Sequence, residues 1–341
     1  MRLCLSRTSR LLVLAVLSGL PGLAGAEPFR LIVTHLEPPL VPNSVMDLAL
    51  DLGYFEREGV EVELIRVQQT PSAIAALQAG EGEMANVGVD ALLQLAAQGV
   101  TDLRAIGSPN RQLPFLIAAR EDIATPADLE GRSFGVGRVG SLDYSLSVNV
   151  LGSLGVDVGG LEIVGLGQPP ERAQALAAGQ IDATTISIGV WLSLPDKTGL
   201  AVLVDQDTYA AAAPVVNKVN VVTQEVLDTR GAEVEGILRA LIAISRDFAA
   251  DPNLWAAAMV PYAPNLDEAG LQSLAATFGS AWSVNGGLSA SELSYTQDWV
   301  YQTEDFAGIP TIAPLAWVDF GPLDRVLAQV GVAETGDQPD R

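Results

Sequence analysis

Few side chains in this sequence are of the types that perform acid–base or nucleophilic chemistry. The 341 residues contain one histidine, His35, and one cysteine, Cys4. A zinc site built from Cys and His needs several such ligands, and a disulfide needs two cysteines. A Ser-His-Asp hydrolase would have to rest on His35 alone. We therefore predict no catalytic residue, no metal site and no cofactor, and turn to side chains that could hold a ligand.

Candidate ligand-binding residues lie in loops that follow predicted strands or open predicted helices. The start of a helix offers free backbone N–H groups and a positive dipole end, which suit an anionic or strongly polar group. In the loop Gly140-Ser141, the glycine allows close backbone approach and the serine can cap a helix. Tyr144, Trp191 and Phe115 offer flat faces for stacking. The predicted ligand-binding residues are His35, Glu37, Asn43, Thr70, Ser72, Gly88, Asp90, Ser108, Asn110, Arg111, Arg138, Gly140, Ser141, Tyr144, Gln168, Ser187 and Trp191.

The charges in these loops leave the ligand's own charge open. Arg111 and Arg138 would attract a sulfonate or a carboxylate. Glu37 and Asp90 would instead suit a cationic group, and His35 an amine, a heterocycle or another hydrogen-bonding group. Both alternatives stand on the sequence alone.

Composition narrows the class of protein. The chain is 49% hydrophobic and 18% charged, with a mean hydropathy of +0.30. Its formal net charge of −22 makes nucleic acid an unsuitable partner. The length predicts about two domains.

The first 26 residues have the order of a secretory signal peptide. Arg2, Arg7 and Arg10 precede an apolar run over 11–23, and Ala24-Gly25-Ala26 offers a cleavage site. The run is shorter than the ~20 residues of a membrane-spanning helix. Removal of residues 1–26 would take away the only cysteine and leave a net charge of −25. We expect an exported chain without a lipid anchor, and a bacterial periplasm fits best.

Strands and helices are predicted to alternate through the rest of the chain, which is typical of a mostly parallel α/β sheet. Strands are predicted at 29–35, 60–67, 84–89 and 103–107. Helices are predicted at 44–52, 70–79 (with Thr70 as N-cap) and 90–97. A helical tail is predicted at 233–248, 254–259, 268–278, 289–306 and 323–330.

Part of this pattern is repeated. Residues 53–95 and 152–194 both run through Gly-Val or its equivalent, a strand, a polar turn, an Ala/Leu/Gln-rich helix and a second strand. Both helices end in Ala-Gly, at Gly80 and Gly179, and Pro71 and Pro169 lie near their starts. The same unit used twice predicts two similar lobes.

Three segments resemble one protein family. The segment 51–60, DLGYFEREGV, resembles the G-Y-F-x-x-E-G-[LV] signature of the NMT1/THI5-like periplasmic solute-binding proteins. The segment 175–183, ALAAGQIDA, and the segment 128–132, DLEGR, resemble two further motifs of this family. The family belongs to the nitrate, taurine and alkanesulfonate class of ABC transporters, which includes SsuA-like and TauA-like proteins.

This resemblance implies a type II periplasmic-binding-protein fold, in which two α/β lobes are joined by two hinge crossover strands. Lobe one would comprise residues 27–115 and 219–341, and lobe two residues 116–218. The hinge candidates are 115–118 and 219–222. The implied function is capture of a small solute, a sulfonate-like anion or a small heterocycle, by closure of the lobes and delivery to an ABC permease. We expect a monomer and no enzyme activity.

Two other classes of function remain open. The same module could be a sensor that signals to a membrane receptor. The second class is an exported enzyme of the same superfamily. The enzymes of that superfamily that use a Cys-rich segment do not match this chain, which would have no cysteine after removal of residues 1–26. The segment 135–140, GVGRVG, has the G-x-G-x-x-G spacing of a dinucleotide site, but the expected acid at the end of the next strand is missing.

Overall fold

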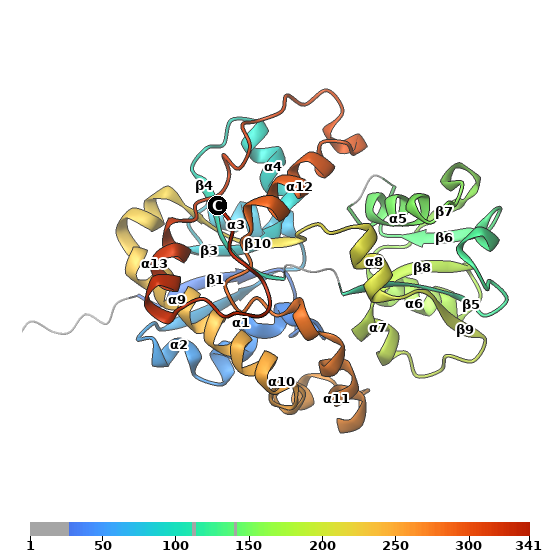
Figure 1. Ribbon diagram of the computed structural model, residues 1–341, viewed down its shortest axis with the longest axis horizontal. Helices are drawn as coiled ribbons and strands as arrows, with labels where there is room; N and C mark the ends of the chain where they lie inside the picture. Colours follow the sequence, from blue (N-terminus) through green and yellow to red (C-terminus); the bar gives the residue numbers. More distant parts are fainter. Residues whose placement is uncertain (1–26, 111–113, 140–141) are drawn as a thin grey trace, which may run out of the picture.

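The computed structural model describes residues 27–110, 114–139 and 142–341. Within this part of the chain, ten strands form two five-stranded sheets, one in each of two lobes that lie side by side (Figure 1). The predicted α/β class is therefore confirmed. The predicted signal peptide, residues 1–26, lies outside the described residues. None of the described helices is long and apolar enough to cross a bilayer.

The sheet of the first lobe has the order β2-β1-β3-β10-β4. β1 is parallel to β2 and β3, whereas β10 runs antiparallel to its neighbours β3 and β4. The strands are β1 (Phe29–Val33), β2 (Val62–Arg66), β3 (Met84–Gly88), β4 (Leu103–Asn110) and β10 (Lys218–Thr223).

The sheet of the second lobe has the order β7-β6-β8-β5-β9. β6 is parallel to β7 and β8, and β5 is antiparallel to β8 and β9. The strands are β5 (Phe115–Arg120), β6 (Ser133–Val136), β7 (Glu162–Gly165), β8 (Ala183–Ser187) and β9 (Leu200–Val204). Strand order and directions match those of the first sheet, so the two lobes are built alike, as the internal repeat predicts.

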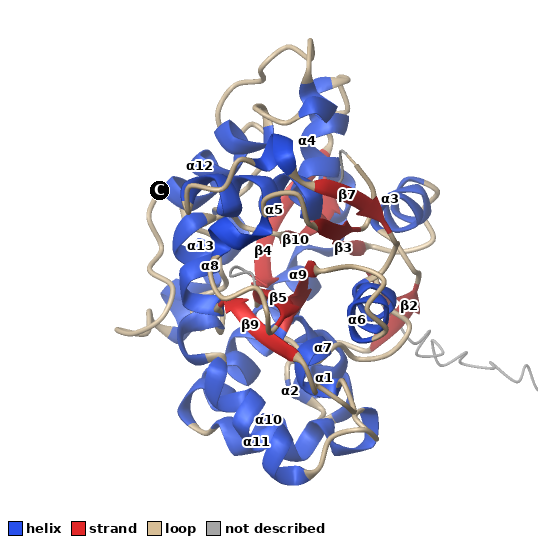
Figure 2. Ribbon diagram, turned by 90° about the vertical axis from the view of Figure 1, so that its right-hand side faces the viewer, coloured by secondary structure: helices blue, strands red, loops and turns tan. Residues whose placement is uncertain are grey.

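Helices surround the strands of both sheets (Figure 2). The first lobe carries α1 (Val45–Asp51), α2 (Tyr54–Arg57), α3 (Thr70–Gln78), α4 (Val89–Ala97), α9 (Gln224–Ala250), α10 (Pro252–Met259), α11 (Glu268–Thr277), α12 (Ala290–Val300) and α13 (Gly321–Val330). The second lobe carries α5 (Leu142–Ser153), α6 (Pro169–Ala177), α7 (Ile188–Ser193) and α8 (Gln206–Ala212). The short 3-10 helices are Pro42–Ser44, Pro126–Leu129, Val158–Gly160, Val260–Tyr262, Gly279–Ala281 and Glu304–Phe306.

The repeated helices α3 and α6 end for the same reason. Gly80 and Gly179 follow them with φ of +72° and +69°, a left-handed conformation that suits glycine. At the other end, Gln69 and Gln168 are the N-cap residues, and a proline lies in each first turn. Thr70, predicted as an N-cap, is instead the first residue of α3.

The C-terminal helices pack on the first lobe. The long helix α9 lies against β4, β10, α1, α2, α10 and α13. It is kinked at Arg230, whose φ and ψ of −125° and 23° are not helical. Trp255 and Trp282 both pack edge-to-face against Phe278 in this region, and all three side chains are fully buried. The helix predicted over 289–306 is shorter, and ends at Val300.

The chain crosses between the lobes twice. The first crossing joins β4 to β5, and the second joins α8 to β10. The segments 115–118 and 219–222, predicted as crossover strands, each belong to one sheet, so each follows a crossing and does not itself make it. The lobes also touch directly: α11 contacts α7, and a Cβ built on Gly189 would lie 2.6 Å from the Leu40 carbonyl oxygen.

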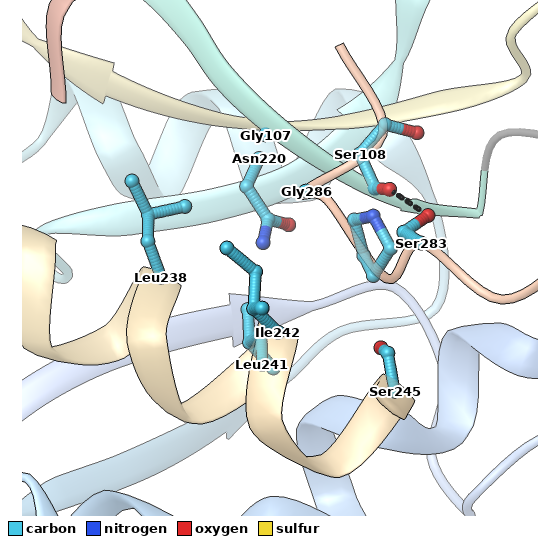
Figure 3. A pocket seen from close by; sticks show the side chains of 10 residues that line it. Gly107, Ser108, Asn220, Leu238, Leu241, Ile242, Ser245, Ser283 and Gly286 are labelled. Atoms are coloured by element: carbon cyan, nitrogen blue, oxygen red, sulfur yellow. Dashed lines mark hydrogen bonds between the residues drawn. The ribbon is translucent and has the colours of Figure 1, made fainter. Parts of the chain in front are cut away.

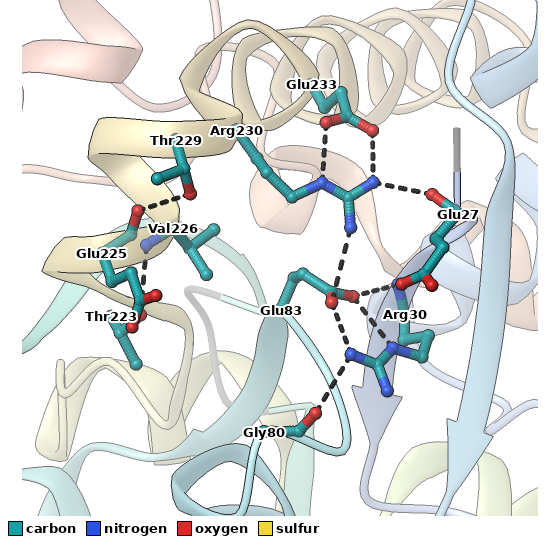
Figure 4. Close-up of polar contacts among 10 residues, drawn as sticks. All are labelled: Glu27, Arg30, Gly80, Glu83, Thr223, Glu225, Val226, Thr229, Arg230 and Glu233. Atoms are coloured by element: carbon teal, nitrogen blue, oxygen red, sulfur yellow. Dashed lines mark hydrogen bonds and ion pairs between the residues drawn. The ribbon is translucent and has the colours of Figure 1, made fainter. Parts of the chain in front are cut away.

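A cluster of ion pairs joins β1, the start of β3 and the kink of α9 (Figure 4). The Glu83 carboxylate accepts hydrogen bonds from the backbone N–H and the guanidinium of Arg30, both at 2.6 Å, and lies 3.4 Å from Arg230. Arg230 also pairs with Glu233 and donates to the Glu27 carbonyl oxygen. This cluster ties the first strand to the return helix.

Candidate functional site

A cavity between the lobes consists of two adjoining hollows. The polar hollow has a volume of about 450 Å³ and the apolar hollow about 780 Å³. The two hollows share five lining residues, which are Phe115, Gln168, Pro169, Asn217 and Lys218. Because these residues come from both lobes, a molecule bound here would contact both. The volumes lie in the range of small-molecule sites.

Lys218 is the charged residue shared by both hollows. It is the first residue of β10, and its Nζ donates to Thr34 Oγ1 at 2.6 Å, just beyond the end of β1. Burial lowers the pKa of the Lys218 ammonium group to about 8, and the nearby Asp90 carboxylate opposes this shift. Burial also raises the pKa of Asp90, and this effect outweighs the backbone N–H groups at the start of α4, which lower it. The site therefore holds a partly desolvated cation.

The polar hollow is organised around Arg172, which is 3% exposed. Its guanidinium donates to the carbonyl oxygens of Gly167 at 2.5 Å and Thr185 at 3.0 Å. It lies 3.4 Å from Asp143, whose Oδ2 also accepts from the Gly137 N–H at 2.7 Å. Burial lowers the pKa of Arg172. Arg172 and Asp143 thus fix the two glycine loops that form the wall of this hollow.

Two glutamines face the polar hollow from opposite lobes. Gln69 precedes α3 and Gln168 precedes α6, at equivalent positions of the internal repeat. Neither side chain caps its own helix. Each amide can therefore donate or accept hydrogen bonds with a ligand.

Arg138 lines one hollow of the cavity and His35 the other. Arg138 lines the polar hollow, is 71% exposed, and reaches Asp305 of the first lobe at 3.9 Å. His35 lines the apolar hollow, and its Nε2 lies 2.8 Å from the buried carboxylate of Asp47. Asp47 is paired in turn with Arg66 at 2.7 Å. The imidazole is therefore oriented by a buried acid.

The sequence profile of the NMT1/THI5-like proteins matches residues 45–253, more than half of the chain. This protein belongs to the NMT1/THI5-like family. The resemblance predicted from the three sequence motifs is confirmed.

One relative of this protein is a binding protein of Brucella abortus, which is 26% identical over 215 residues. The match covers 57% of this chain and 65% of the relative. The taurine-binding periplasmic protein of Escherichia coli is 25% identical over 223 residues, 65% of this chain and 66% of the relative. The chain thus spans just under two-thirds of the length of these curated relatives.

Solved structures show the same fold. The periplasmic aliphatic sulphonate binding protein SsuA of Escherichia coli has a TM-score of 0.65 at 17% identity, covering 86% of this chain and 92% of that one. The desulfurization enzyme DszB has a TM-score of 0.64 at 17% identity, covering 89% and 99%. The periplasmic-binding-protein fold is therefore established for this family member.

Some of the ligand-binding residues predicted for this protein line the cavity, and others lie elsewhere. Those that line it are His35, Asn43, Arg138, Gln168 and Ser187. Arg111, Gly140 and Ser141, and the side chain of Asn110, lie outside the described residues. The predicted residues that are not among the lining residues are Glu37, Thr70, Ser72, Gly88, Asp90, Ser108, Tyr144 and Trp191.

Several of these have other roles that explain their positions. Trp191, predicted as a ligand-stacking residue, is 9% exposed and packs in the apolar core of the second lobe. Ser108 is buried and donates to the Lys218 carbonyl oxygen at 2.7 Å. Thr70 Oγ1 accepts from the Gly88 N–H at 3.2 Å, which joins the starts of α3 and α4.

Three of the others are exposed to solvent or packed against the core. Glu37 and Ser72 are exposed to solvent. Tyr144 is half-buried and packs against the apolar core.

Sequence reasoning missed Lys218, Asn217, Gln69, Arg172 and Asp143. Lys218 is one of only two lysines in the chain and directly precedes the strand predicted as a hinge. Gln69 stands at the repeat position of Gln168, so the repeat itself held that signal. Nothing in the sequence indicated that Arg172, in the middle of an apolar helix face, would be buried.

Proposed function

We propose that this protein captures a small organic solute between its lobes and delivers it to the membrane subunits of an ABC importer. The observation that carries the proposal is the cavity shared by both lobes, with the Lys218 ammonium group where its two hollows meet. The likeness to the taurine-binding periplasmic protein supports the same class of function.

The ligand we favour is a sulfonate-like anion. Lys218 supplies a positive charge that burial deprives of water, so an acidic group bound there replaces the lost hydration. The amides of Gln69 and Gln168 can add hydrogen bonds from opposite lobes. A small heterocycle stacked on Phe115 is the alternative ligand.

Binding proceeds by closure of the lobes. Groups from both lobes reach the ligand together only when the lobes close, so the ligand stabilises the closed form. The permease would recognise that form. The proposed place of action is the periplasm, and the proposed state is a monomer.

A sensor that signals to a membrane receptor is the second candidate, since closure would serve it equally. We favour binding over catalysis, although DszB shares the fold. The only histidine is held by Asp47, and the only cysteine, Cys4, lies in the predicted signal peptide.

The test is to identify what the protein binds. Mass spectrometry of small molecules released from natively purified protein would reveal a co-purified solute. A ligand at 100 times its dissociation constant should raise the free energy of unfolding by about 2.7 kcal/mol. If no compound of a broad panel of sulfonates, carboxylates and heterocycles raises the melting temperature, the proposal fails. ATPase stimulation of the cognate permease would separate transport from sensing.

A further inference from the structure

The edge strand β4 pairs unevenly with β10. Between Ala105 and Asn110, β4 advances by five residues while β10 advances by only three, from Val221 to Lys218. On its other side, β10 pairs with β3 in one regular register. Extra residues in one strand bend it locally, and bulges of this kind can redirect a side chain near a binding site. The uneven pairing ends at Lys218, the charged residue shared by both hollows.

The Ser108 hydroxyl supplies one hydrogen bond of this uneven pair. Pro109 follows Ser108 in β4 and has no N–H to donate to the neighbouring strand. Ser108 Oγ donates instead to the Lys218 carbonyl oxygen at 2.7 Å. Because Ser108 is 1% exposed, this bond is shielded from water. The backbone of Lys218 is therefore held by a side chain of β4.

Ser108 is itself fixed by the loop 282–289, which precedes α12 (Figure 3). Ser283 Oγ donates to the Ser108 carbonyl oxygen at 2.5 Å, and the Ser108 N–H donates to the Gly286 carbonyl oxygen at 2.9 Å. A Cβ built on Gly287, whose φ is +71°, would lie 2.1 Å from the Ser108 carbonyl oxygen. Glycine at this position is what allows the loop to lie so close to β4.

The C-terminal segment after α13 holds this loop in turn. Asp337 is 3% exposed, and its carboxylate accepts from the N–H groups of Asn285 at 3.0 Å and Gly287 at 2.7 Å. A continuous set of contacts thus runs from the C-terminal segment, through the loop and Ser108, to the backbone of Lys218. Each member of this set is buried, so the start of β10 has a rigid support.

We propose that Ser108 is a positioning residue for ligand binding, which holds the start of β10 so that the Lys218 ammonium group stays where the two hollows meet. This inference rests on the proposed function, in which an anionic ligand meets Lys218. Ser108 lines neither hollow, so it acts through Lys218 and not by touching the ligand. A group that is already held in place loses less conformational freedom on binding, which strengthens its contact with the ligand.

Ser108→Ala removes the hydroxyl and takes away the donor to the Lys218 carbonyl oxygen. The start of β10 should then become more mobile and the Lys218 ammonium group better hydrated. The pKa of Lys218, which burial lowers to about 8, should rise towards 10.5. The affinity for propanesulfonate or butanoate should fall about tenfold, because the ammonium group is no longer held for the ligand.

An NMR titration of protein carrying ¹³C-labelled lysine measures this pKa without any ligand. The chain has two lysines, so Lys197 provides an internal reference in the same spectrum. The Lys197 signal should titrate alike in the wild-type protein and in Ser108→Ala. Titration calorimetry with propanesulfonate and with butanoate measures the affinities.

Thr184→Val is a matched control in the second lobe. Thr184 is 0% exposed, and its Oγ1 donates to the Gly135 carbonyl oxygen of the neighbouring strand at 2.8 Å. Its replacement should lower stability about as much as Ser108→Ala but leave the Lys218 pKa and the affinities unchanged. If Ser108→Ala does not fold, Ser283→Ala decides, since it removes the bond to the Ser108 carbonyl oxygen and should change both quantities in the same direction.

The inference requires that the Lys218 pKa and the affinity both change. If either stays as in the wild-type protein, or if Thr184→Val changes both equally, the inference is overturned and the proposed function stands. If neither anion binds the wild-type protein, the anionic ligand of the proposed function is overturned. A rise of the Lys218 pKa in Ser108→Ala would in that case still show that Ser108 positions Lys218.

Discussion

Replacement of Lys218 by methionine should strengthen the ligand-free fold while it weakens binding. Methionine fills a similar volume but carries no charge to desolvate. In the wild-type protein, burial lowers the pKa of Lys218 from 10.5 to about 8, so the charged form is disfavoured in the folded state at neutral pH. Removal of that charge removes the unfavourable contribution to stability.

The magnitude follows from the pKa. A lowering from 10.5 to about 8 corresponds to about 3 kcal/mol of lost stability when the amine is protonated in both states. Lys218 is only half-buried, so water screens part of this effect, and we expect Lys218→Met to be more stable by about 1–2 kcal/mol at pH 7. The difference is fully present below pH 8 and disappears as the pH rises towards 10.5, because the folded protein releases its proton first.

Urea unfolding at pH 7 and above pH 10 measures this difference. Titration calorimetry with an anionic ligand measures the second effect. The association constant of the wild-type protein should fall about tenfold between pH 7 and pH 9, since the free protein loses its ammonium group over that range. Lys218→Met should bind weakly at both pH values.

The other lysine, Lys197, supplies a matched control. Its Nζ donates to the carbonyl oxygens of Leu192 and Leu194, and it lines neither hollow. Lys197→Met should lose about 1 kcal/mol of stability and bind normally. If Lys218→Met is less stable than the wild-type protein at pH 7, or binds anions unchanged, the role assigned to Lys218 is wrong.

Two further predictions concern the frame around the cavity. Glu83→Gln should cost about 2 kcal/mol at pH 7, measured by urea unfolding. Burial alone would raise the pKa of Glu83, but its bonds to Arg30 outweigh this and lower it, so the difference should shrink as the pH falls below 4.5; an equal difference at pH 3 and pH 7 would contradict the ion-pair explanation. Gly189→Ala should weaken ligand binding with little change in stability, because the new Cβ would meet the Leu40 carbonyl oxygen of the other lobe at 2.6 Å; unchanged affinity in calorimetry would show that this contact does not take part in closure.

The sequence predicted the secondary structure and the two-lobe plan well because those depend on local patterns. The strand over 29–35 and the helix over 70–79 were found from apolar spacing, proline and glycine, which act within a few residues. The repeat then implied that both lobes share one plan. These signals do not depend on contacts between distant segments.

The binding residues were harder to predict, since a cavity forms from segments that are far apart in the chain. Lys218 and Thr34 are separated by 184 positions, and their contact depends on how β10 returns to the first sheet. Trp191 shows a second limit of local patterns. It lies in the predicted loop, but its side chain points into the core because helix α7 presents that face to the sheet.

The placement of β5 and β10 has a consequence for how the chain acquires its structure. The antiparallel strand that follows the first four strands, β5, lies in the second sheet, and the equivalent strand after the next four, β10, returns to the first. The fifth strand of each half of the chain thus belongs to the sheet of the other half. This arrangement resembles a domain-swapped dimer fused into one polypeptide. The second sheet can assemble from one continuous stretch, whereas the first lacks the strand between β3 and β4 until residue 223 is available. The lobe that is synthesised first is therefore the one that is completed last.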